Sequence, residues 1–244
     1  MDISKNIVYE DKGIIIVYKP AGVPVQTKSI TVMDLESQVK NYLAKKTKSN
    51  PYLGMIHRID QPVEGLVLFA KNEKMAAELS KEINNGEIEK YYMAVVCGKP
   101  QKENDKLVDY LLKDMKTNLS IISNKENKKA KKSTLEYSVI GESKKQGPCE
   151  NCKNAGLCEG TTLLDIRLFT GRHHQIRVQL SNAGFPIAGD RKYNKLPGNE
   201  VTHFPALCAY RLKFKNPSTG EQLDVKHVPQ GDFYNFFDLE QYFD

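Results

Sequence analysis

Two short segments of the sequence concentrate side chains that could carry out acid–base or anion chemistry. The first is His57-Arg58-Ile59-Asp60, which lies just before an apolar run that begins at Gly65. The second runs from Thr170 to Arg177 and places two arginines and two histidines at the start of a predicted helix, where backbone N–H groups favour anions. If Asp60 and Arg177 meet, the guanidinium keeps the carboxylate ionised and oriented for catalysis. The alternative is a structural ion pair between two loops.

Alternating apolar residues and turn signals predict the elements that must position these segments. We expect strands over 7–9, 14–18, 65–70, 88–97, 107–112, 119–122, 130–140, 161–169, 208–214 and 222–225. We expect helices from Ser29 or Thr31 to about Lys46, over 73–84 with Asn72 as its N-cap, over 173–182, and over 232–243. This pattern predicts an α+β fold with a mixed, largely antiparallel sheet flanked by helices and loops. One domain is expected over 1–244, with an inserted Cys-containing loop at about 141–160.

The composition is that of a soluble globular protein. The 244 residues are 40% hydrophobic and carry a formal net charge of +6. The strongest apolar run, Ile14 to Tyr18, is far shorter than the ~20 residues of a membrane span, and the N-terminus lacks a secretory signal. These features predict a cytoplasmic protein. The stretch from Lys125 to Lys132 holds five lysines, which is typical of phosphate-backbone binding, although a solvated hairpin tip is the alternative.

Five cysteines, an odd number, favour reduced thiols over a disulfide framework. Cys149, Cys152 and Cys158 could supply three thiolates of a zinc or iron–sulfur site, but no fourth ligand lies at a standard spacing. We therefore interpret this segment as a loop with free thiols and predict no metal.

Several motifs, in order along nearly the whole chain, resemble those of one family. His57 to Asp60 followed by Gly65 to Lys71 resembles the HRLD…GLLL-AK motif of RluA-type RNA pseudouridine synthases. Five other segments resemble further motifs of that family, namely 11–24, 90–98, 170–180, 186–193 and 209–220. The resemblance implies the pseudouridine synthase catalytic fold, and conversion of uridine to pseudouridine in structured ribosomal or transfer RNA.

By matching motifs, the resemblance implies three catalytic residues. Asp60 matches the catalytic aspartate, Arg177 its basic partner, and Tyr92 the active-site tyrosine that can stack on uracil and take a proton from its carbon 5. Whether Asp60 attacks the sugar, attacks the base or removes a ribose proton stays open. The reaction involves no redox change or group transfer, so no cofactor is expected, and the sequence has no Gly-rich phosphate loop.

The resemblance also implies contacts with RNA. Arg58 matches the arginine that fills the base stack when the target uridine flips out. Arg172, His174 and Gln175 are predicted to contact phosphates or to support their loop, and His57 to contact RNA or the scaffold. The chain opens on catalytic-domain sequence without the family's S4 module, so RNA affinity is expected from the domain itself. A monomer is expected, although no motif bears on the oligomeric state. Lys128, Lys129, Lys131 and Lys132 are the predicted basic contacts, with the 141–160 insertion beside them.

The sequence departs from the family pattern at a few positions. Ile59 replaces a usual Leu, Val63-Glu64 stands where Thr-Ser is common, His173 replaces a usual Thr or Ser, and Gln179 replaces a usual His. We expect these changes to affect specificity more than activity. Two other functions remain open: a catalytically inactive RNA-binding relative, and a sugar hydrolase in which Glu64 supplies the second of two carboxylates.

Overall fold

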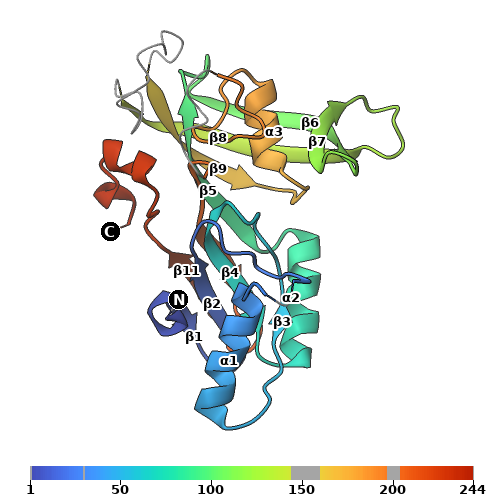
Figure 1. Ribbon diagram of the computed structural model, residues 1–244, viewed down its shortest axis with the longest axis vertical. Helices are drawn as coiled ribbons and strands as arrows, with labels where there is room; N and C mark the ends of the chain where they lie inside the picture. Colours follow the sequence, from blue (N-terminus) through green and yellow to red (C-terminus); the bar gives the residue numbers. More distant parts are fainter. Residues whose placement is uncertain (1, 30, 144–159, 197–203, 244) are drawn as a thin grey trace. The chain divides into compact units, whose positions relative to one another are not determined.

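The computed structural model describes residues 2–29, 31–143, 160–196 and 204–243. These residues form two compact units (Figure 1). Unit 1 comprises Met1–Glu89 and Ala209–Pro229, and unit 2 comprises Lys90–Cys208 and Gln230–Asp244. Both units combine antiparallel strands with helices, which confirms the predicted α+β class. The grouping of the whole chain into one catalytic domain stays a prediction. Among the described residues, no helix is long and apolar enough to cross a membrane.

Unit 1 is built on a sheet whose central strands are buried on both faces. Its elements are η1 (Ile3–Asn6), β1 (Ile7–Glu10), β2 (Ile14–Lys19), β3 (Gly54–Met55), β4 (Glu64–Ala70), β10 (Leu207–Lys215) and β11 (Gln222–Lys226). The strand order is β1-β2-β4-β10-β11, and β3 pairs with β4. Every residue of β2 and β4 is buried, as expected for strands that read as continuous apolar runs. One face of this pair, with Ile14, Ile16 and Leu68, packs against Leu79 of helix α2.

Helix α2 (Glu73–Asn85) begins as predicted, and helix α1 (Leu35–Thr47) does not. The side chain of Asn72 accepts the N–H of Met75, which satisfies one of the exposed donors of the first turn. For α1, neither Ser29 nor Thr31 is the cap: Asp34 accepts the N–H of Ser37 at 2.8 Å. The predicted start of α1 was therefore wrong, because Val32 continues the apolar spacing in the sequence but lies outside the helix.

Asp11 fixes the tight turn between β1 and β2. Its Oδ1 accepts the N–H groups of Gly13 and Ile14, each at 2.7 Å, and its Oδ2 accepts the amide of Asn216 at 2.7 Å. Burial raises the pKa of Asp11, but these hydrogen bonds outweigh it and hold the pKa below its ordinary value. Asp11 and Asn216 thereby join the β1–β2 turn to the β10–β11 turn.

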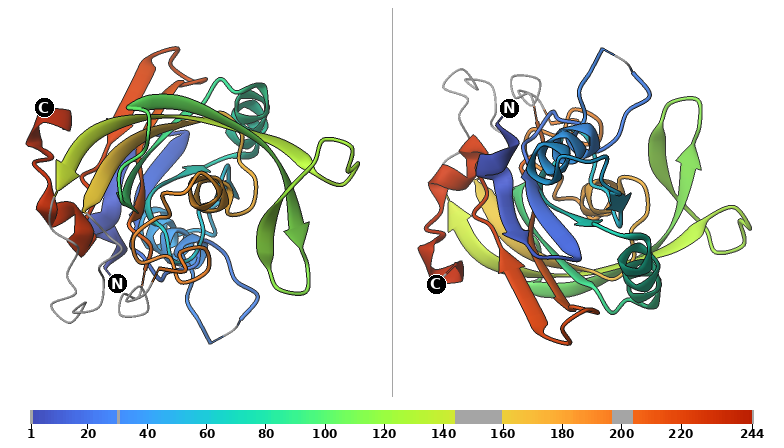
Figure 2. Two further views of the ribbon diagram at one scale, coloured as in Figure 1. Left: turned by 90° about the horizontal axis from the view of Figure 1, so that it is seen from above. Right: turned by 90° about the horizontal axis from the view of Figure 1, so that it is seen from below.

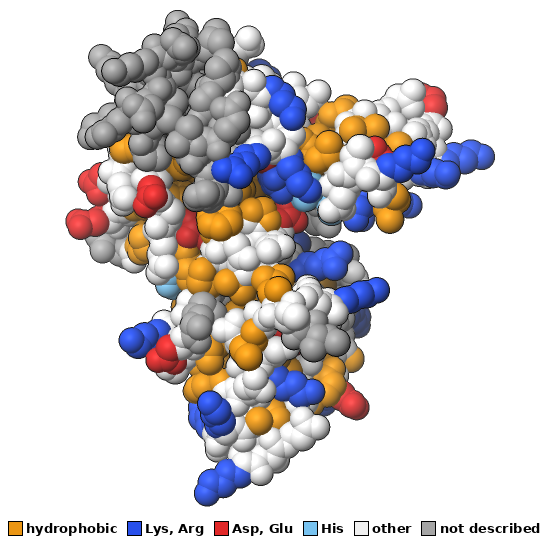
Figure 3. Space-filling view, in the orientation of Figure 1, with side chains coloured by type: hydrophobic (Ala, Val, Ile, Leu, Met, Phe, Trp, Pro, Cys, Tyr) orange, Lys and Arg blue, Asp and Glu red, His pale blue; other side chains and the backbone are white. Residues whose placement is uncertain are grey.

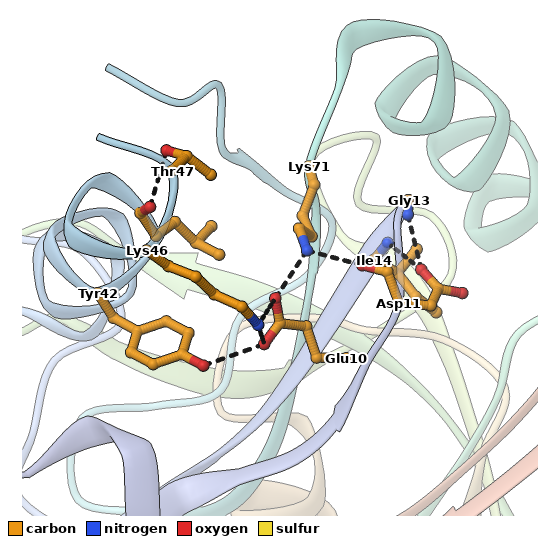
Figure 4. Close-up of polar contacts among 9 residues, drawn as sticks. Glu10, Asp11, Gly13, Ile14, Tyr42, Lys46, Thr47 and Lys71 are labelled. Carbon is orange, nitrogen blue, oxygen red and sulfur yellow. Dashed lines mark hydrogen bonds and ion pairs between the residues drawn. The ribbon is translucent and has the colours of Figure 1, made fainter. Parts of the chain in front are cut away.

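Glu10 links the same region to α1 and to the end of β4 (Figure 4). It pairs with Lys71 at 2.8 Å and with Lys46 at 2.9 Å, and it accepts the hydroxyl of Tyr42 at 3.2 Å. Lys71 also donates to the backbone carbonyl of Asp11 at 2.7 Å. Lys71, the last residue of the motif that follows Gly65, therefore has a structural function.

Gly65 is required by the close approach of β10. Its φ is +129°, a conformation that L side chains rarely adopt, and a Cβ placed on it would lie 2.5 Å from the backbone N and O of Ala209. The glycine of this motif is thus explained by strand packing.

Unit 2 contains five strands, paired antiparallel, that curl around helix α3 (Gln175–Asn182) (Figure 2). Its strands are β5 (Glu89–Cys97), β6 (Asn104–Asp114), β7 (Leu119–Ser123), β8 (Lys131–Ser143) and β9 (Thr161–Leu168), in the order β5-β9-β8-β6-β7. The strand predicted over 130–140 extends further, because β8 continues through Gly141 to Ser143. The insertion at about 141–160 stays a prediction. Cys149, Cys152 and Cys158 lie outside the described residues.

The C-terminal segment is not the single helix that its aromatic spacing predicts. It forms two short 3₁₀ helices, η3 (Asp232–Phe236) and η4 (Glu240–Tyr242), separated by extended backbone at Phe237. This break lets two aromatic hydroxyls reach backbone carbonyls of the sheet: Tyr234 donates to Met93 at 2.9 Å and Tyr242 donates to Ile140 at 2.7 Å. Tertiary contacts therefore override the helical pattern.

Candidate active site

Asp60 lies on a tight turn between β3 and β4. The carbonyl of Asp60 accepts the N–H of Val63 at 3.0 Å, which closes a four-residue turn. Ile59 and Val63, on either side of the turn, are buried, whereas Asp60 itself is half-buried. Two apolar anchors thus hold a partly accessible carboxylate at the start of a rigid strand, which suits a catalytic group.

A second loop holds this turn in place. Gln61 exchanges two hydrogen bonds with Gly22: its carbonyl accepts the Gly22 N–H at 2.9 Å, and its side-chain amide donates to the Gly22 carbonyl at 3.1 Å. The fully buried Lys19 donates its Nζ to the carbonyls of Gln61 and Pro20, each at 3.0 Å. The Lys-Pro-x-Gly part of the opening motif therefore supports the loop of Asp60.

The two residues before Ile59 differ in their surroundings. Nε2 of His57 accepts the backbone N–H of Leu68 at 3.2 Å, so this nitrogen carries no proton in that contact. That geometry is the scaffold alternative that the sequence left open for His57. Arg58 is exposed and has no hydrogen bond or ion pair with any described residue. Their contacts with RNA stay predictions.

Glu64 is buried at the start of β4. The hydroxyl of Tyr18 donates to its carboxylate, and the Tyr18 ring stacks on His227 with ring centroids 4.0 Å apart. Burial is the main cause that lowers the pKa of His227, and the Glu64 charge partly opposes it. A carboxylate enclosed in this way resembles a structural group more than the second acid of a sugar hydrolase, which must reach an open glycosidic bond.

In unit 2, Arg177 forms a buried bidentate ion pair that the sequence did not predict. Its Nε and Nη2 donate to the two carboxylate oxygens of Asp190, each at 2.7 Å, and the two side chains are 3% and 0% exposed. Asp190 also accepts the backbone N–H groups of Lys192 and Tyr193. The guanidinium of Arg177 therefore has a fixed plane. Its pairing with Asp60 joins residues of different units and stays a prediction.

Aromatic rings complete the surroundings of Arg177. The guanidinium lies 5.3 Å from the centroid of the Tyr193 ring, and the Tyr193 hydroxyl contacts Nδ1 of His174 at 2.8 Å and the N–H of Ser120 at 2.7 Å. His174 stacks on His173. Burial, aided by the charge of Arg177, lowers the pKa of His174 to about 2, so the ring is neutral at physiological pH. These contacts match the structural alternative that the sequence allowed for His174.

Gln175 and Arg172 shape the loop before α3. Oε1 of Gln175 accepts the hydroxyl of Thr170 at 2.8 Å and the N–H of Arg172 at 3.1 Å, and its Nε2 donates to the carbonyl of Thr134 at 3.2 Å. Gln175 is buried and supports the loop. Arg172 is exposed, and its Nε donates to the carbonyl of Lys132 at 3.3 Å. Of these two residues, Arg172 has the exposed side chain, and its charge is therefore accessible to solvent.

The remaining predicted residues lie on strands and their connections. Tyr92 is buried on β5, opposite Ile166 of β9. The predicted basic residues Lys128, Lys129, Lys131 and Lys132 are all exposed, in or just after the β7–β8 connection. Lys and Arg side chains gather toward that end of the sheet (Figure 3). Their contact with RNA stays a prediction.

Sequence reasoning missed three residues that support the site: Lys19, Asp190 and Tyr193. Each belongs to a segment that resembles a family motif, and each is buried. Their types gave a usable signal, because a lysine or aspartate inside a motif needs a partner when it is buried. The sequence does not say which partner it finds.

The family model described as RNA pseudouridylate synthase matches residues 13–182, which is more than half of the chain. The chain belongs to this family. It is similar to the ribosomal large subunit pseudouridine synthase C of Buchnera aphidicola subsp. Schizaphis graminum, with 31% identity over 90% of this chain. The chain spans 66% of that relative, just under two thirds of its length.

This member of the RNA pseudouridylate synthase family is also similar to a further curated relative and to a solved structure. The tRNA pseudouridine synthase C of Vibrio cholerae is 28% identical over 91% of this chain and 89% of its own. The solved structure of human RNA Pseudouridylate Synthase Domain Containing 1 superposes with a TM-score of 0.74 at 18% identity, covering 95% of this chain and 86% of that one. This last similarity confirms the predicted pseudouridine synthase fold.

Proposed function

We propose that this protein converts uridine to pseudouridine in ribosomal or transfer RNA. The observation that carries the proposal is the family match over residues 13–182, a range that contains Asp60, Tyr92 and Arg177. The relatives named above support both classes of RNA, since one name refers to the large ribosomal subunit and the other to tRNA. The reaction breaks the bond between ribose C1′ and uracil N1 and forms a bond between C1′ and C5. The hydrogen of C5 leaves as a proton, and N1 gains one.

We assign to Asp60 the role of the nucleophile or base that starts the cleavage of the glycosidic bond. A stacked uridine hides its glycosidic bond, so the base must leave the stack before a carboxylate can reach it. The half-buried position of Asp60 on a pinned turn supports this assignment, because a nucleophile or base must be held in place yet remain reachable. Arg58, exposed beside it, is assigned to fill the gap in the base stack.

We assign Tyr92 to stack on the uracil ring and Arg177 to orient the carboxylate of Asp60. An aromatic ring on a buried strand offers a rigid stacking surface for uracil. A guanidinium whose plane is fixed by Asp190 can orient a carboxylate at its remaining edge without losing further side-chain entropy. No cofactor is required by this chemistry.

Release of tritium from RNA labelled at uracil C5 tests the proposal, because the new bond to C5 expels that hydrogen wherever the target lies. Unmodified ribosomal RNA and bulk tRNA are the two substrates. We expect release with the wild-type protein and none above background with Asp60→Asn, while RNA binding persists. Asp224→Asn, which makes the same change of charge at an exposed ion pair of unit 1, is the control and should retain activity.

A wild-type protein that binds RNA but releases no tritium from either substrate would instead support the inactive RNA-binding relative. Release by Asp60→Asn at the wild-type rate would contradict the assignment of Asp60 and leave the family function standing.

A further inference from the structure

Lys90, at the start of β5, is a cation that has no counter-ion among the described residues. It is half-buried and, by strand alternation, lies on the same face of β5 as Tyr92. Burial lowers the pKa of its amine. Within the described part of the chain, the amine has no hydrogen bond or ion pair, and no carboxylate offsets its burial. A partly buried charge left in this way costs stability unless an anion joins it.

Gly171 leaves open space beside this amine. A Cβ placed on Gly171 would lie 3.7 Å from Nζ of Lys90, at ordinary contact distance. Gly171 is exposed, and its backbone N–H has no hydrogen-bond partner among the described residues. A small residue next to an unpaired cation, with an N–H left over, is the arrangement with which proteins admit an oxyanion close to the backbone.

Two more cationic residues are linked to Gly171, one by the chain and the other by a hydrogen bond to the first. Arg172 follows Gly171 directly, and its Nε lies 3.3 Å from the carbonyl of Lys132, so the two residues are neighbours. Both are exposed, and neither forms an ion pair with a described residue. The Nη atoms of Arg172 remain available for a bidentate contact. Three cationic residues and a backbone donor thus belong to neighbouring segments of unit 2, and none of the three cations is paired with an acidic residue in the described part of the chain.

We propose that Lys90, the Gly171 N–H and Arg172 form a binding site for one phosphate of the RNA strand, with Lys132 at its outer edge. The inference rests on the proposed RNA substrate and names where unit 2 holds its backbone. A phosphate suits the site because its oxygens can accept from an ammonium, a guanidinium and an amide at once. Lys90 is a binding residue here and takes no part in the chemistry at C1′.

The test measures how RNA affinity depends on salt. Asp60→Asn protein is titrated against a fluorescent transcript of large-subunit ribosomal RNA over a series of KCl concentrations, and Lys90→Met is added to that background. Loss of one phosphate contact should weaken binding about tenfold at low salt and reduce the slope of log K against log salt by about 0.7 to 0.9. Lys90→Arg should retain the slope. Lys99→Met, beyond the opposite end of β5 and paired with the exposed Glu142, removes the same charge and should change neither quantity.

Two further measurements keep the inference decidable if Lys90→Met does not fold. Gly171→Ala adds only a methyl at contact distance from Lys90 and should weaken RNA binding without affecting the fold. Acetylation of Lys90 in the unmutated chain, followed by mass spectrometry, should be slowed by RNA.

The outcomes separate the two proposals. An unchanged salt slope in Lys90→Met, or acetylation of Lys90 that RNA leaves unaffected, overturns the phosphate site while tritium release by the wild type still upholds the proposed function. A wild-type protein that binds no RNA overturns both.

Discussion

The buried pair of Arg177 and Asp190 gives a sharp prediction for stability. Replacing Asp190 with Asn keeps the shape of the side chain but removes its charge, and leaves the guanidinium of Arg177 in a site where both partners are almost fully buried. The exposed pair of Arg211 and Asp224 is a natural control, because it has the same bidentate chemistry with side chains that are 25% and 37% exposed.

The two pairs should differ in energy by several kcal/mol. Removing one partner of a buried ion pair costs about 3 to 5 kcal/mol, because the remaining charge loses that partner's charge at a position that water does not reach. Removing one partner of an exposed pair costs less than about 1 kcal/mol, since water replaces it. Asp190 also accepts two backbone N–H groups, which an amide oxygen satisfies less well than a carboxylate. At 2–4 °C per kcal/mol, Asp190→Asn should lower Tm by about 10 °C and Asp224→Asn by no more than about 4 °C.

Circular dichroism is the suitable probe, because the sequence contains no tryptophan. Thermal and urea unfolding of the wild type, Asp190→Asn and Asp224→Asn would be compared at pH 7. The transition of interest is the one that includes unit 2, whether or not unit 1 unfolds with it. Equal losses in the two variants would refute the reasoning, since burial would then make no difference to what the pair contributes.

Three further predictions concern other sites. Gly65→Ala should destabilise the protein by about 3 kcal/mol or more, because a positive φ adds to a backbone clash with β10; Gly98→Ala, with positive φ but open space, should cost only about 1–2 kcal/mol in the same urea titration. His174 stays neutral in the fold but not in the unfolded chain, so stability should fall as pH drops below about 6.5, by about 1.4 kcal/mol per unit; His174→Asn should lack that slope. Asp11→Ala should cost about 2 kcal/mol at pH 7, and because the folded pKa of Asp11 lies below 3.8, the difference from wild type should shrink as pH falls through that range.

N-cap residues and apolar spacing together predicted where α2 begins. At α1 these two signals disagreed, and the predicted start was wrong. Before α2, the polar residues Lys71 and Asn72 stand where one more apolar turn would place its residues, and Asn72 is the N-cap. Before α1, Val32 continues the spacing of Leu35 by one more turn, so the pattern alone places the start too early. The cap is Asp34, whose pKa is held low by the Ser37 and Thr27 donors despite burial that raises it. Capping chemistry, rather than apolar spacing, therefore decides where this helix begins.

The sequence could show which residues need partners but not which partners they find. Arg177 stands in a cluster of polar groups, and its buried partner, Asp190, lies 13 residues further along the chain, after α3 has ended. Asp165 lies at a comparable separation on the other side of Arg177, and only the path of the chain after α3 selects Asp190. The prediction of one helix over the C-terminal segment was wrong for a similar reason. The contact of Tyr234 with the backbone of Met93 is set by the position of the sheet and not by local helical spacing.

The motif residues divide according to whether the fold itself explains them. Asp11, Gly65 and Lys71 are each accounted for by turns, packing or ion pairs within unit 1. Lys90 and Arg172 also lie in motif segments, yet within the described residues neither has a carboxylate partner. A fold gains nothing from holding an unpaired cation half-buried, whereas a polyanionic substrate supplies the missing counter-charge when it binds. Within the described part of the chain, no ion pair gives Lys90 or Arg172 a role in the stability of the fold, so contacts with RNA should first be sought at these two residues.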